Sequence, residues 1–151
     1  MKGYSKIIPI DLYCRDILFV FGDTRYLRKM IRKYHSQEQT NAIMELFEGV
    51  NDYTQGVTVY KATYNAFVVW FPHLPTSPLE FGFVSHEIFH AAHAIMKNVG
   101  VNLSDDSEEA YAYLIGYLTR KVLDVFPISF CETYQVLESK PTQRECVPAK
   151  E

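Results

Sequence analysis

The strongest local constraint in this sequence is a stretch with helix signals at both ends. At its start Ser77 can cap a helix, Pro78 suits the first helical position, and Glu80 stands three residues after the cap. At its end Gly100 is a typical residue to follow a helix, and no proline interrupts residues 79–99. The pattern predicts one long helix from Pro78 to about Asn98.

Strand-like patterns flank this helix on its N-terminal side. Branched and aromatic residues between Lys6 and Phe21, with a polar break near residue 15, predict two strands that could form a hairpin. Residues 57–61 and 65–71 alternate or run apolar around a polar turn, which predicts a second β-hairpin.

Three further segments have helical periodicity. Two precede the second hairpin, at residues 23–34 and 36–48, and the third is expected to begin at Ser104 or Asp105 and to end before Pro127. The order of these elements predicts an α+β fold, in which a small, mainly antiparallel sheet is packed by about four helices and the long helix is central.

The size and charge of the chain limit its class. With 151 residues and 48% hydrophobic residues, one domain is expected over residues 1–138, followed by a loosely ordered tail at 139–151. Fifteen basic against 18 acidic residues suggest neither nucleic acid nor an anionic membrane as a partner.

Localisation is predicted from the apolar runs and the cysteines. No run approaches the roughly 20 apolar residues of a membrane span, and the N-terminal apolar stretch is too interrupted for a signal peptide. The three cysteines, Cys14, Cys131 and Cys146, lie far apart and are expected to be reduced. A cytoplasmic protein is the expectation.

The long helix contains the motif His86-Glu87-Ile88-Phe89-His90. Histidines four residues apart lie on one helix face, where both imidazoles can bind one metal ion. A catalytic zinc site keeps a position open to water, and the carboxylate of Glu87 could take a proton from that water. The motif predicts a Zn²⁺ cofactor and hydrolytic chemistry.

At this point the sequence resembles the gluzincin zinc metallopeptidases, in a minimal single-domain form. The resemblance covers Pro78 to about Lys121 and implies a third metal ligand from a glutamate on the next helix. Glu109, followed by alanine and 19 residues beyond His90, matches that ligand. It also shares a helix face with Ala112 and Gly116, whose small size predicts a close approach of the two helices.

Several alternatives stay open around these four residues. Glu108 is the fallback ligand. Many gluzincins carry an aspartate where this chain has Tyr113, so Asp105 or Asp106 would have to orient the ligands instead. His93 lies on the same helix face as the motif and is either a packing residue, a partner of the ligands or an alternative ligand.

The function predicted from the sequence is zinc-dependent hydrolysis of a peptide bond, with the substrate lying along the edge of the 57–71 hairpin. Tyr111, Tyr113 or His73 could stabilise the developing oxyanion. The alternatives are a catalytically inactive, zinc-stabilised module that binds a peptide or protein, a purely structural polar cluster, and hydrolysis of a different bond, such as an amide in a cell-wall peptide or a small molecule.

Overall fold

The structure is a computed structural model, and it describes residues 3–50 and 54–130. The predicted tail at 139–151, the end of the predicted domain at 131–138, Cys131 and Cys146 lie outside the described residues. Within them the protein is α+β, as the sequence predicted.

Both predicted hairpins are present. Strands β1 (Tyr4–Ile10) and β2 (Arg15–Phe21) pair antiparallel, as do β3 (Val57–Lys61) and β4 (Ala66–Phe71). Each hairpin turns through a three-residue 3-10 helix followed by one residue in the left-handed conformation, Cys14 in the first and Asn65 in the second. The two hairpins therefore share one connection geometry.

The hairpins join through a parallel pair, β2 with β4, and give a four-stranded mixed sheet in the order β1-β2-β4-β3. The prediction of a mainly antiparallel sheet is confirmed, since two of the three pairings are antiparallel. Strands β1 and β3 form the two edges of the sheet.

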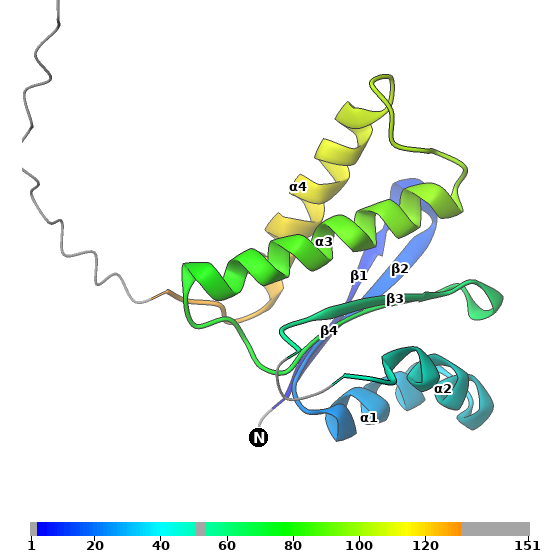
Figure 1. The fold of residues 1–151 in the computed structure, drawn as a ribbon, viewed down its shortest axis with the longest axis vertical. Coiled ribbons are helices and arrows are strands. Elements are labelled where there is room, and N and C mark those ends of the chain that lie inside the picture. Colours follow the sequence, from blue (N-terminus) through cyan, green and yellow to red (C-terminus); the bar gives the residue numbers. More distant parts are fainter. Residues whose placement is uncertain (1–2, 51–53, 131–151) are drawn as a thin grey trace, which may run out of the picture.

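Helices cover both faces of the sheet (Figure 1). Helices α1 (Thr24–Tyr34) and α2 (Gln37–Met44) lie on one side, and α3 (Pro78–Asn98) and α4 (Glu108–Val125) on the other. Alternate residues of β2 and β4 divide between the two cores: Phe19 and Val69 face α3 and α4, whereas Val20 and Val68 face α1 and α2. Residues 17–21 of β2 and all of β4 are apolar because both of their faces are buried, whereas β2 begins with the charged residues Arg15 and Asp16.

Two helix boundaries differ from the prediction. The second helix gives way after Met44 to a 3-10 turn at Glu45–Phe47 instead of continuing to Glu48. Helix α4 begins at Glu108, so the predicted start at Ser104 or Asp105 is wrong. The Ser107 hydroxyl accepts a hydrogen bond from the Ser104 amide at 2.9 Å and donates to the Asn102 carbonyl at 2.6 Å, which keeps this segment in a turn.

Candidate functional site

Helix α3 carries the His-Glu-x-x-His motif near its middle, and its start is fixed as the sequence predicted. Ser77 caps it by accepting a hydrogen bond from the Glu80 amide at 3.2 Å. The Glu80 carboxylate reaches back to the amide and hydroxyl of Thr76, at 2.7 and 2.9 Å, instead of to the cap residue itself. The hydrogen bond from the Thr76 amide lowers the pKa of Glu80 below its usual value.

His86 and His90 lie one turn apart and present their imidazoles together on the exposed side of α3. Their Nε2 atoms are 3.0 Å apart, and the rings meet edge to face with centroids 4.6 Å apart. Two nitrogens that bind one tetrahedral zinc at the usual bond length stand about 3.3 Å apart. At 3.0 Å the two nitrogens are within hydrogen-bond distance of each other, and their separation is also close to that of two nitrogen ligands of one zinc ion.

Unlike the exposed His86 and His90, Glu87 lies between α3 and the sheet. It is buried, with 9% of its surface exposed, and belongs to the few buried polar residues of the described chain. Its backbone carbonyl accepts a hydrogen bond from the Thr58 hydroxyl of β3 at 3.0 Å. Burial of this one charged residue, on the strand-facing side of the motif, distinguishes it from an ordinary surface glutamate.

Strand β3 runs alongside α3. Besides the bond between Thr58 and Glu87, the Asn98 side-chain amide donates to the Tyr60 hydroxyl about three helical turns further along α3. β3 pairs with β4 on one side and, within residues 3–50 and 54–130, with no other strand on its second side. The edge strand next to the motif helix is thus the one where the sequence predicted that a substrate would lie.

His93 lies one turn beyond His90, half-buried against α4. Its ring centroid is 6.4 Å from that of Phe89 and 6.1 Å from that of Tyr111. Two aromatic neighbours agree with the interpretation of His93 as a packing residue.

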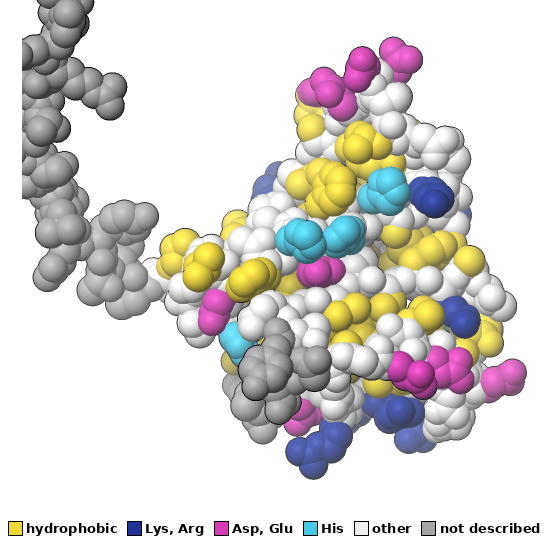
Figure 2. Space-filling view, in the orientation of Figure 1, with side chains coloured by type: hydrophobic (Ala, Val, Ile, Leu, Met, Phe, Trp, Pro, Cys, Tyr) yellow, Lys and Arg dark blue, Asp and Glu magenta, His cyan; other side chains and the backbone are white. Residues whose placement is uncertain are grey.

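The two candidate carboxylate ligands, Glu108 and Glu109, occupy the first turn of α4, and both are exposed. Among the described residues no group of three or more His, Cys, Asp or Glu side chains is arranged to hold a metal ion. Figure 2 shows acidic side chains gathered at the tip where α4 begins, apart from the histidines on α3. The structure thus brings His86 and His90 together but leaves the carboxylates outside the pair.

The packing argument for Glu109 is wrong. Ala112 and Gly116 are exposed, and a Cβ atom added at Gly116 would meet nothing within 4 Å, so this face does not approach α3 closely. The buried face of α4 consists of larger residues: Tyr111, Leu114, Leu118 and Val122. Glu108, three residues before Tyr111, lies nearer that face than Glu109 does.

The other residues that the sequence offered for the site are Tyr111, Asp105, Asp106 and His73. Their hydrogen bonds, where the structure shows any, are made away from the motif. Tyr111 donates its hydroxyl to the Val101 carbonyl at 3.0 Å, and burial raises the pKa of its phenol. Asp105 and Asp106 are exposed in the turn before α4. His73 is exposed, with its Nδ1 2.9 Å from the Leu74 carbonyl. None of the four is held beside the histidine pair by these contacts.

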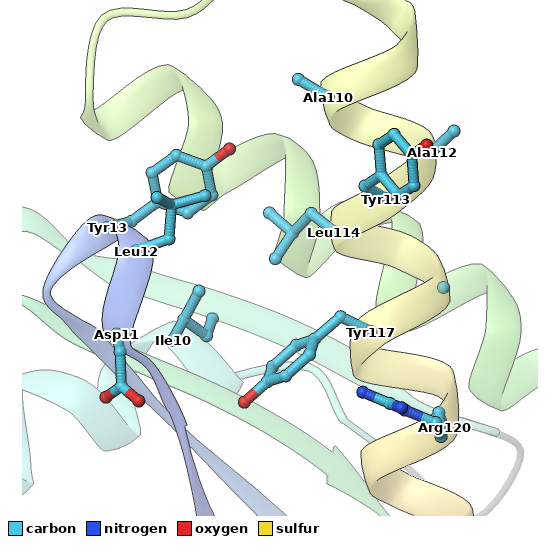
Figure 3. Close-up of a pocket in the computed structure, with 11 residues that line it drawn as sticks. Ile10, Asp11, Leu12, Tyr13, Ala110, Ala112, Tyr113, Leu114, Tyr117 and Arg120 are labelled. Atoms are coloured by element: carbon cyan, nitrogen blue, oxygen red, sulfur yellow. The ribbon is translucent and has the colours of Figure 1, made fainter.

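A pocket of about 730 Å³ lies between the end of the first hairpin and α4 (Figure 3). It is lined by residues 10–13, at the end of the first hairpin, and by α4 residues between 110 and 120, among them Tyr113, Tyr117 and Arg120. Its lining contains none of His86, Glu87 and His90. Tyr113, which the sequence offered as an oxyanion donor, faces this pocket instead.

Two contacts of the motif, those of Gly56 and Thr58 with Glu87, were not predicted from the sequence. A glycine just before a strand is the only signal that was available for Gly56, and a single threonine in a strand carries none. Gly56 lies just before β3 and Thr58 within it, and both are more than 25 residues before the motif.

Comparison of the chain with protein-family models, with curated proteins and with solved structures finds no match. Among the described residues no helix is long and apolar enough to cross a membrane. The fold and the site define a small α+β protein in which a helix with a His-Glu-x-x-His motif packs beside an edge strand.

Proposed function

We propose that this protein is a zinc-dependent peptidase in which His86, His90 and Glu109 hold the metal and Glu87 is the catalytic base. The observation that carries the proposal is the convergence of the two Nε2 atoms, 3.0 Å apart, on a helix whose adjacent Glu87 is buried against an edge strand. In the absence of metal the same two nitrogens share a hydrogen bond, and zinc would replace that bond with two nitrogen–metal bonds.

Zinc, when bound, supplies a Lewis acid that polarises the substrate carbonyl and lowers the pKa of a water molecule to about 7. The chain contributes the rest. The Glu87 carboxylate accepts the proton of the attacking water and returns it to the nitrogen of the leaving amine. The free edge of β3 offers backbone hydrogen bonds to an extended polypeptide, which aligns a peptide bond beside the motif.

The third ligand would come from one of two adjacent glutamates in the first turn of α4. Glu109 matches the resemblance to gluzincins, whereas Glu108 lies nearer the buried face of α4. Either carboxylate would have to come within reach of the histidine pair.

Metal analysis of purified variants tests the binding site. Wild-type protein is expected to hold close to one zinc per chain, with severe loss in His90→Ala and in Glu109→Ala. His93→Ala is the matched control, because it removes a neighbouring imidazole outside the motif and should keep the metal. Loss of zinc in Glu108→Ala with retention in Glu109→Ala would transfer the ligand to Glu108, and a wild type without zinc would refute the site.

Hydrolysis of unfolded protein and of mixed peptides tests the reaction. Glu87→Gln keeps the size of the side chain but cannot accept the proton, so it should retain zinc and lose hydrolysis by at least about 100-fold. If wild type and Glu87→Gln bind peptides equally and neither cleaves them, the protein is instead the inactive, zinc-stabilised binding module.

A further inference from the structure

Gly56, just before β3, lies where a side chain would meet that of Glu87. A Cβ atom added at Gly56 would lie 2.9 Å from Glu87 Cγ, and 2.6 and 2.8 Å from Cε1 and Cδ1 of the Phe71 ring. These separations are shorter than ordinary van der Waals contact between carbons. The backbone of Gly56 is outside the left-handed region, unlike that of Gly22, Gly49 and Gly100, so what requires glycine here is space.

The aromatic side of this contact has little room to move. Phe71 is 2% exposed, and its ring stacks on Phe21 with centroids 5.0 Å apart. Phe21 in turn meets Phe126 edge to face at 4.8 Å. A core packed in this way resists the displacement of a ring.

The strand is also unable to withdraw freely. The Thr58 hydroxyl, two residues further along the chain, is bonded to the backbone carbonyl of Glu87, and the Tyr60 hydroxyl accepts from Asn98. The strand and α3 are thus linked on the C-terminal side of Gly56. An added methyl group would clash most closely with the Phe71 ring and next with Glu87 Cγ. Of these two side chains, that of Glu87 turns away more readily because its carboxylate lies beyond the contacted Cγ, whereas the ring is fixed in the core.

We infer that Gly56 is a positioning residue for Glu87: the absence of a side chain at 56 leaves the glutamate the conformation from which its carboxylate serves the histidine pair. The steric part of this inference stands on the contacts alone. Its catalytic consequence rests on the proposed peptidase function.

The steric part is tested by thermal unfolding, which needs no activity. Gly56→Ala should lower the Tm by about 3–10 °C, the usual effect of overpacking in a domain of this size. In the Glu87→Ala background, which lacks the Cγ atom, the same substitution should lower the Tm by less, and the loss that remains is that of the clash with Phe71. Gly82→Ala is the matched control, since a Cβ atom at this α3 position meets nothing within 4 Å. It should not lower the Tm in either background.

The catalytic part is tested by kinetics and metal content together. Gly56→Ala should lower kcat by about 10–100-fold while KM and bound zinc stay within about twofold of wild type, because the base moves and the ligands do not. Gly82→Ala should match wild type in all three. In Glu87→Gln, adding Gly56→Ala should cost no further activity, which a general loss of structure would not reproduce.

Equal loss of Tm in both backgrounds would overturn the inference, and so would a Gly56→Ala enzyme as active as wild type. If Gly56→Ala does not fold, the comparison is made in Phe71→Leu, where the two nearest ring atoms are gone and Glu87 Cγ is the next nearest atom to the added methyl group. A wild type that hydrolyses nothing refutes the peptidase proposal but leaves the Tm comparison to decide the contact between Gly56 and Glu87.

Discussion

Replacing Thr58 by valine measures how firmly β3 is held against the motif helix. The Thr58 hydroxyl donates to the Glu87 carbonyl at 3.0 Å, and the two residues are 29 positions apart in the chain. Valine keeps the branched shape and the preference for strands, so the change mainly removes the hydroxyl. A hydrogen bond of this kind contributes about 0.5–1.5 kcal/mol to the free energy of unfolding.

The expected loss for Thr58→Val is about 1 kcal/mol, because the Glu87 carbonyl lies inside α3 and keeps its helical amide partner. This corresponds to a fall in Tm of about 2–4 °C for a domain of this size. Urea unfolding should show the same loss as a lower midpoint with an unchanged m value. If the protein is a peptidase, kcat/KM should fall as well, since the edge strand is less well placed.

Thr119→Val is the matched control for this measurement. The Thr119 hydroxyl is also part-buried and also donates to a carbonyl, that of Ile115 at 2.8 Å, but both residues belong to α4. This variant should leave hydrolysis unchanged, because the bond joins no strand to the motif. A Thr58→Val protein as stable as wild type would refute the idea that this bond anchors β3.

Three other perturbations have expected outcomes. Burial lowers the pKa of His35, against a smaller opposite effect of its hydrogen bond with Gln39, so the folded protein holds a neutral His35 where the unfolded chain is already protonated. Stability should therefore decrease as the pH falls below about 6.5, and the decrease measured by Tm should be shallower in His35→Gln. The hydrogen bond from the Thr76 amide lowers the pKa of Glu80, so the carboxylate stabilises the start of α3 above about pH 4.5 and ceases to do so in more acidic solution. Glu80→Ala should lower the Tm more at pH 7 than at pH 3. Gly116→Ala should raise the free energy of unfolding by about 0.4–1 kcal/mol in a urea titration, because the position is helical, exposed and free of neighbours within 4 Å. A loss of stability would instead mean that α3 packs closely against this face.

The elements with strong local signals were predicted well. Ser77, Pro78 and Gly100 define the long helix almost to the residue, since capping and the conformational limits of proline and glycine act within a few positions. Both hairpins were predicted from alternation and turn residues. The parallel pairing of β2 with β4 was not predicted, because it joins residues about 50 positions apart and leaves no local pattern.

In the candidate site, too, the contacts within one helix were predicted and the contacts between distant parts of the chain were not. The spacing of His86 and His90 within one helix predicts that their imidazoles meet, and the two Nε2 atoms are 3.0 Å apart. The contacts of Glu87 with Gly56 and Thr58 depend on how a strand far away in the sequence packs on α3. Helix periodicity contains no information about that packing.

Helix α4 shows why the choice of the third ligand went beyond what the sequence supports. Small residues at 112 and 116 suggested a face for close helix contact, but the larger apolar residues Tyr111, Leu114 and Leu118 define a different face, and that one is buried. Burying large apolar side chains stabilises the fold more than bringing two backbones together at alanine and glycine, so the apolar stripe decides the rotation of the helix. Of the two adjacent glutamates, Glu108 then lies on the margin of the buried face and Glu109 nearly opposite it. If Glu109 is nevertheless the ligand, zinc binding has to rotate or shift the first turn of α4, and amide hydrogen exchange at residues 108–111 should slow on addition of zinc in wild type but not in His90→Ala.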